Sequence, residues 1–153
     1  MNIRTATIGD IDELVKLFDA YRVFYKQESD LKGATQFLTD RLTFKDSEIF
    51  VASQDDKLLG FVQLYPRFSS TYLKRIWLLN DLFVSPEARG KNVGVRLIER
   101  AKVLAFSTKS VGLLLETEKT NDIGNKLYPK TGFTLDTLHN FYFWEVEKTN
   151  LEP

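Results

Sequence analysis

The first part of the chain has apolar residues at helical spacing. After Gly9 and Asp10 the spacing continues through most of one long segment, and such a pattern predicts an amphipathic helix. The apolar positions are Ile11, Leu14, Val15, Leu17 and Phe18, followed by Tyr21, Phe24 and Tyr25. Asp10 is a good N-cap for this helix. A short strand is expected before it, over residues 3–6, and a shorter second helix over residues 34–42.

The middle of the chain has the pattern of strands. Apolar residues dominate 49–52 and 58–65, and the polar turn Asp55-Asp56-Lys57 separates them. This arrangement predicts a β-hairpin. A loop over residues 66–72 and a long strand over residues 74–84 are expected to follow.

Helix and strand patterns alternate in the last third. A helix is expected over residues 93–105, a buried strand over 111–117, a short helix over 122–131, and two final strands over 133–138 and 141–146. The order β-α-α-β-β-β-α-β-α-β-β predicts an α+β fold. Its single sheet is mixed and mostly antiparallel, with helices on both faces.

Composition narrows the possible functions. The 153 residues are expected to form one domain over 1–153. The 21 basic and 21 acidic residues cancel, which argues against a nucleic-acid partner recognised by bulk charge. The chain has no cysteine and a single histidine, His139, so thiolate catalysis and Cys- or multi-His metal sites are excluded. We find no signal-peptide pattern and no apolar run of membrane-spanning length, and therefore expect a cytoplasmic protein without a membrane partner.

The segment from Leu79 to Leu97 carries the strongest functional signal. An apolar strand runs into Ser85-Pro86, then into a basic loop with glycine, then into an amphipathic helix. The start of a helix offers unpaired N–H groups and the positive end of the helix dipole, which suit a phosphate or pyrophosphate. Taken alone, the same pattern also fits an ordinary loop and helix cap.

Two motifs resemble those of GNAT-superfamily N-acetyltransferases. Arg89-x-x-Asn92-x-Gly94 resembles the Q/R-x-x-G-x-G/A signature, and residues 121–133 resemble the N-x-x-A-x-x-x-Y-x-x-x-G-F element. The resemblance implies the fold predicted above, with acetyl-CoA as co-substrate and no metal. Asn92 replaces the usual glycine, and asparagine is among the non-glycine residues that best tolerate a positive φ.

The resemblance also implies which residues hold acetyl-CoA. Backbone groups of Leu82, Phe83 and Val84 would pair with the pantetheine arm, on a strand that splays from its neighbour. The pyrophosphate would lie on the loop and helix start, where backbone N–H groups and two basic side chains gather. These residues are Arg89, Gly90, Lys91, Asn92, Val93, Gly94 and Val95, and Asn121 of the second motif is added to the cofactor set.

The catalytic groups are only partly indicated. The resemblance makes Tyr128 the group that assists the departing CoA thiolate. Leu79–Val84 further resembles a strand of the diamine and spermidine/spermine branch, which implies a small amine or polyamine acceptor. That branch has a glutamate where this chain has Asn80, which cannot act as a base. Asp81 is expected on the opposite strand face, so Glu116, Glu118 and a water held by Asn80 stay open as alternatives.

Other acceptors and another class of function stay open. Glu28 and Asp30 favour a cationic acceptor, whereas a basic loop favours an amino acid or a peptide; that loop contains Arg67, Lys74 and Arg75. Because Asn80 stands where a catalytic carboxylate is expected, the protein could also be a non-catalytic acyl-CoA-binding module. Finally, the aromatic segment Phe141–Trp144 indicates a homodimer.

Overall fold

The computed structural model describes residues 1–146, so the end of the predicted domain, residues 147–153, lies outside the described part. The strands are β1 (Asn2–Thr5), β2 (Glu48–Gln54), β3 (Lys57–Ser69), β4 (Lys74–Val84) and β5 (Leu113–Leu114). The α-helices are α1 (Ile11–Phe24), α2 (Leu31–Phe44), α3 (Val93–Ser107) and α4 (Asp122–Lys130), and two short 3₁₀ helices cover Ile8–Asp10 and Pro86–Ala88.

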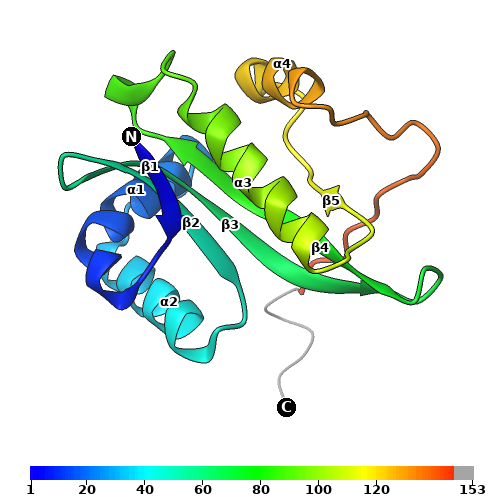
Figure 1. The fold of residues 1–153 in the computed structure, drawn as a ribbon, viewed down its shortest axis with the longest axis horizontal. Helices are drawn as coiled ribbons and strands as arrows, with labels where there is room; N and C mark the ends of the chain where they lie inside the picture. Colours follow the sequence, from blue (N-terminus) through cyan, green and yellow to red (C-terminus); the bar gives the residue numbers. More distant parts are fainter. Residues whose placement is uncertain (147–153) are drawn as a thin grey trace.

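The strands form one sheet in the order β1-β2-β3-β4-β5, in which only β4 and β5 pair in parallel. Figure 1 shows α1 and α2 on one face of this sheet and α3 on the other. One apolar core lies under α1 and α2 and is built around Leu14, Leu38 and Phe61. A second core lies under α3, around Leu97, Ile98 and Val62. The predicted α+β class and mixed, mostly antiparallel sheet are confirmed.

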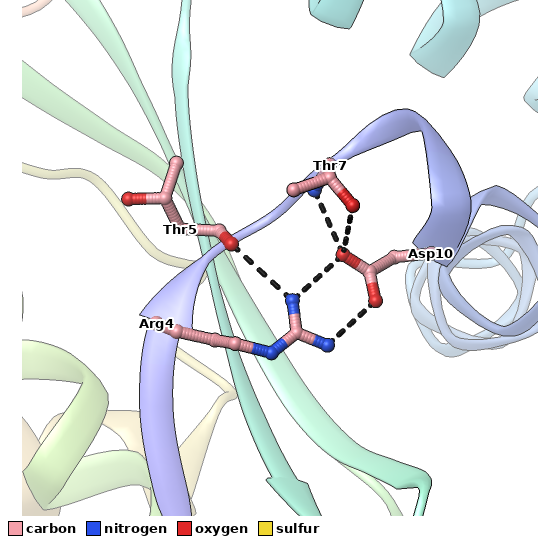
Figure 2. A network of polar contacts seen from close by, with 4 residues as sticks. All are labelled: Arg4, Thr5, Thr7 and Asp10. Carbon is pink, nitrogen blue, oxygen red and sulfur yellow. Dashed lines mark hydrogen bonds and ion pairs between the residues drawn. The ribbon is translucent and has the colours of Figure 1, made fainter.

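A polar network fixes the start of α1 against β1 (Figure 2). The Arg4 guanidinium donates to both carboxylate oxygens of Asp10, at 2.8 and 2.7 Å, and the Thr7 backbone N–H donates to the same carboxylate at 2.7 Å. The hydrogen bond from Arg4 lowers the pKa of Asp10 to about 2. Asp10 does stand at the N-cap of α1, but its carboxylate reaches back to β1 and Thr7 instead of capping the helix.

The β2–β3 hairpin and the long strand follow the prediction. Asp55 and Asp56 both have positive φ, at 50° and 60°, as in the tight turns that join antiparallel strands. The predicted strand 74–84 has the same bounds as β4. The predicted loop 66–72 is partly wrong, because β3 continues through Pro66 to Ser69. Beyond Leu64 this strand pairs only with β4, and proline is tolerated where one strand edge is free.

The C-terminal strands are the main difference from the prediction. In the predicted strand 111–117 the regular ladder with β4 is limited to Leu113 and Leu114, preceded by backbone hydrogen bonds of Val111 and Gly112 to β4. The described residues after Gly132 form no regular secondary structure. Beyond Phe133, which packs against the core, the large apolar side chains face solvent, with Phe141, Tyr142, Phe143 and Trp144 between 73% and 86% exposed. An alternating apolar pattern forms a strand only when a neighbouring edge pairs with it, and the described chain supplies no such pairing for residues 133–146. In residues 1–146 no helix is both long and apolar enough to cross a membrane.

Candidate active site

The site begins where β4 and β5 separate. Their parallel ladder joins Trp77 to Leu113 and Leu78 to Leu114 and ends there. From Leu79 to Val84 the β5-facing edge of β4 therefore has no strand partner within residues 1–146. Backbone groups of Leu82, Phe83 and Val84 lie on this stretch, where an extended ligand could pair with them.

A β-bulge at Asn80 organises the middle of β4. Gln63 of β3 pairs with Asp81 and Leu64 pairs with Leu79, so Asn80 is the extra residue. The bulge interrupts strict alternation, and the Asn80 amide donates to the Asp81 carboxylate at 2.9 Å. The prediction that alternation separates Asp81 from the Asn80 site is therefore wrong, because the extra residue brings both side chains into one cluster.

Asp81 is a buried carboxylate with several polar neighbours. Its side chain is 4% exposed. Gln63 Nε2 donates to Asp81 Oδ2 at 2.8 Å, and Tyr21 Oη donates to the carbonyl of Asn80 at 3.3 Å. Burial raises the pKa of Asp81, while hydrogen bonds from Gln63, Tyr21 and Asn80 oppose that rise. A carboxyl group whose pKa is raised toward neutrality is better suited to general-base work than a free aspartate.

Tyr21 of α1 lies beside this carboxylate, and Tyr25 and Tyr128 lie near Tyr21. The Tyr21 ring contacts Tyr25 and Phe83, with centroid distances of 5.0 and 6.4 Å. Tyr128 of α4 is half-buried against Phe133, 5.7 Å away. Burial raises the pKa of Tyr128 to about 12, and the nearby Tyr25 adds to the rise. The fold thus brings Asn80, Asp81 and Tyr128 into one region.

The start of α3 lies at the end of β4. Asn92 has φ 59° and Gly90 has φ 78°, so asparagine adopts the left-handed turn expected of it. No side chain caps the first turn of α3. A Cβ added to Gly94 would lie 3.4 Å from Leu127 Cδ2 and 3.8 Å from Val84 Cγ2. This glycine therefore marks the junction of β4, α3 and α4.

The other predicted site residues differ in their exposure and in their hydrogen bonds within the protein. Lys91 is exposed in the loop before α3, and Val93 is buried behind it. Arg89 Nε donates to the Val84 carbonyl at 3.3 Å, so this side chain lies against the end of β4. The side chain of Asn121 caps α4 through Gly124 N–H and donates to Thr117; its amide is already used within the protein. Glu116 follows β5 and is exposed.

The structure also places the charged residues that were expected to select the acceptor. Asp30 accepts from Gly33 N–H at 2.8 Å and caps α2, so it is not a free acceptor-binding group. Arg67, Lys74 and Arg75 lie around the far end of the β3–β4 hairpin. At about 3.4 Å per residue, Arg75 is about 17 Å along the strand from Asn80. The basic loop therefore does not border the Asp81 cluster.

Sequence reasoning missed Gln63 and Ser47, which extend the polar cluster behind Asp81. A polar residue inside the apolar strand 58–65 was the available signal for Gln63. Nothing in the sequence pattern indicated Ser47.

This combination defines a class of protein. The sheet that opens between two parallel strands, the uncapped glycine-containing helix start and the half-buried Tyr128 match the features that the GNAT resemblance implies for an acyl-CoA-dependent acyltransferase. The acetyltransferase (GNAT) family model matches residues 12–133, and the chain belongs to this family.

Individual relatives agree with this assignment. The chain is 46% identical to the uncharacterized N-acetyltransferase YhfO of Bacillus subtilis over 90% of its length and 92% of the relative's. The crystal structure of a "probable acetyltransferase" superposes with a TM-score of 0.90 at 40% identity, over 96% of this chain and 99% of that one. Streptothricin acetyltransferase of Escherichia coli is 34% identical over 70% of this chain and 59% of its own length. The protein is therefore an N-acetyltransferase with acetyl-CoA as its co-substrate.

Proposed function

We propose that the chain acetylates a small cationic amine, with a polyamine as the leading acceptor, by direct attack of the amine on acetyl-CoA in a ternary complex. The observation that carries this proposal is the buried carboxylate of Asp81 beside Tyr21, whose ring in turn contacts the Tyr25 ring. A carboxylate next to aromatic faces suits an alkylammonium group through charge pairing and cation–π contact. The similarity to an acetyltransferase named for streptothricin, an antibiotic, supports a small-molecule acceptor.

In this mechanism Asp81 removes the proton of the acceptor. An alkylammonium of pKa about 10.4 is only about 0.1% neutral near pH 7.4, so attack requires a base. One proton of the ammonium passes to Asp81, and the neutral amine nitrogen then forms a bond to the thioester carbon. The carbon–sulfur bond breaks, and the second proton lost by nitrogen ends on the CoA sulfur, whose developing charge Tyr128 stabilises with a hydrogen bond. Asn80 holds Asp81 and does not itself take the proton. Glu116 stays a weaker candidate base because it is exposed and outside the Asp81 cluster.

The remaining groups bind acetyl-CoA. We propose that the unpaired backbone of Leu82, Phe83 and Val84 holds the pantetheine arm and polarises the thioester carbonyl. The first turn of α3, with Arg89 and Lys91, holds the pyrophosphate. Asn121 contributes by fixing the start of α4, which carries Tyr128.

Acetyl-CoA turnover against matched acceptors tests the proposed function. We expect kcat/KM to be higher for putrescine and spermidine than for free amino acids and short peptides. Raising the salt concentration should lower this preference, because it screens the attraction between the charges. A higher kcat/KM for peptides or amino acids than for polyamines would show that the proposed acceptor class is wrong. Acetyl-CoA binding without CoA release for any amine would favour the non-catalytic binding module.

We also propose that two copies associate through the exposed aromatic segment Phe141–Trp144. A soluble monomer rarely leaves so contiguous an apolar patch uncovered. Light scattering during size-exclusion chromatography should give twice the 17.7 kDa chain mass, and replacing Phe143 and Trp144 by serine should shift it to one chain. Phe106→Ser, at an 88% exposed position on α3, is the matched control that should stay dimeric. A monomeric parent protein at tens of micromolar would exclude the proposal.

A further inference from the structure

A buried polar relay lies behind Asp81, on the side away from the Asn80 amide. Gln63 is completely buried, at 0% exposure. Its Nε2 donates to Asp81 Oδ2 at 2.8 Å, and Ser47 Oγ donates to its Oε1 at 3.0 Å. Since an ionised carboxylate only accepts hydrogen bonds, the Gln63 amide must turn its nitrogen toward Asp81. That orientation leaves its oxygen for the hydroxyl of Ser47.

This relay occupies space that an apolar side chain would fill at lower cost. The strand neighbours of Gln63 are Val62 and Leu64, both 0% exposed. Burying a primary amide costs free energy that its hydrogen bonds only offset. Packing alone therefore gives no reason for glutamine here, whereas holding Asp81 does.

We propose that Ser47 and Gln63 are positioning residues for the base: Ser47 fixes the Gln63 amide, and Gln63 holds one oxygen of Asp81. The inference rests on the proposed role of Asp81. A carboxylate has about four lone-pair sites, so with Oδ2 held by Gln63, Oδ1 by Asn80 and Tyr21 also donating to the group, a site is left for the acceptor proton. The relay also keeps the carboxylate ionised in a buried position, because a hydrogen bond to the charged form favours that form.

Other titratable groups near Asp81 do not obscure this effect. Tyr21 of α1 and Tyr65 of β3 lie close enough for Asp81 to influence them, and burial raises the pKa of both phenols. Both therefore stay neutral while the carboxylate titrates. Arg41 and Asp46 also act on Tyr65 and form an ion pair of 2.8 Å with each other. Asp81 is thus the carboxyl group expected to define the acidic limb of the rate profile.

The test is the pH profile of kcat/KM for the full-length enzyme with acetyl-CoA and its best amine acceptor. Gln63→Met removes the donor at similar volume and should move the acidic limb upward by about one pH unit. Ser47→Ala should move it in the same direction by less. Gln63→Glu should move it furthest, because two adjacent carboxyl groups disfavour ionisation of both. Gln54→Met and Ser53→Ala, on the neighbouring strand β2, are the matched controls and should leave the limb in place.

The outcomes separate this inference from the base assignment. The acidic limb of the parent enzyme could disappear in Asp81→Asn and yet stay at the same pH in Gln63→Met and Ser47→Ala. That result would overturn the relay and leave Asp81 as the base. A parent enzyme without an acidic limb would overturn both. If Gln63→Met does not fold, Ser47→Ala, which removes one hydroxyl at a half-buried position, decides the matter.

Discussion

Asp81→Asn is expected to lower kcat by about 10²–10⁴-fold, the usual contribution of a general base. The change keeps the shape of the side chain, removes its charge and its ability to accept a proton, and replaces one of its two acceptor oxygens with an NH2 donor. Acetyl-CoA should still raise the melting temperature of the variant by mass action, because Asp81 is not among the groups assigned to the cofactor. Stopped assays of CoA release and thermal shift with acetyl-CoA measure the two effects separately.

The parent enzyme provides an independent check through its pH dependence. The pKa of Asp81 is raised by burial, so the carboxylate form is lost at a higher pH than for a free aspartate, whose pKa is about 3.9. Activity should therefore fall as pH decreases through this raised pKa, and this limb should be absent in Asp81→Asn. Asp19→Asn is a useful comparison, because Asp19 is also buried but holds Ser29 and Asp30 in the α1–α2 loop. Turnover by Asp81→Asn at the parent rate would remove Asp81 from the mechanism.

The same raised pKa has a consequence for stability. A carboxyl group with a higher pKa in the folded than in the unfolded state binds more protons when folded. The contribution of Asp81 to the free energy of unfolding is therefore most favourable at pH values below its unfolded pKa and declines as pH rises through the folded one. A charge that is unfavourable for stability at neutral pH is consistent with selection for chemistry at this position.

Periodicity predicted most of the fold because the first two helices, the hairpin and β4 each bury one continuous face. Leu14 and Phe18 lie at helical spacing and are both buried in the α1–α2 core. The final strands could not be predicted in the same way. Their alternating apolar residues favour a β-strand, but a strand forms only where a neighbouring strand has a free edge. The regular ladder between β5 and β4 has only two residue pairs. The pattern of apolar residues within one segment does not indicate where the pairing edge of a neighbouring strand ends.

The parts of the candidate site that depend on local backbone geometry could be predicted from the sequence. The parts that depend on the β-bulge in the sheet could not. Asn92 and Gly94 indicated the turn and helix start directly. The bulge at Asn80, by contrast, arises from the register between β3 and β4, which no single strand encodes. It reverses the expected separation of Asn80 and Asp81 and brings Gln63 behind them. The polar residue inside an apolar strand was the one trace of this arrangement in the sequence.

Tyr128→Phe is expected to lower kcat by about 10²-fold, at the lower end of the range for acid assistance, with little change in acetyl-CoA affinity. The reason lies in the pKa of the phenol, about 12, compared with about 8.5 for a thiol. Complete proton transfer to the departing thiolate is uphill by more than three pKa units. A hydrogen bond that strengthens as charge develops on sulfur is therefore the main contribution of Tyr128.

Matched variants distinguish this role from a structural one. Tyr72→Phe removes the same hydroxyl from a 66% exposed ring outside the site and should leave turnover unchanged. Gly94→Phe should show the reverse pattern to Tyr128→Phe, because a large side chain there would press on Leu127 and Val84. It would displace the first turn of α3, which is proposed to hold the pyrophosphate, and abolish the thermal shift with acetyl-CoA. Gly94→Ala, whose Cβ meets Leu127 at an ordinary 3.4 Å, should fold normally. Since Tyr128 stays protonated below its pKa, Tyr128→Phe should not remove any basic limb below about pH 10. Parent-like turnover in Tyr128→Phe would mean that the tyrosine only packs against Phe133 and that the thiolate finds its hydrogen bond elsewhere.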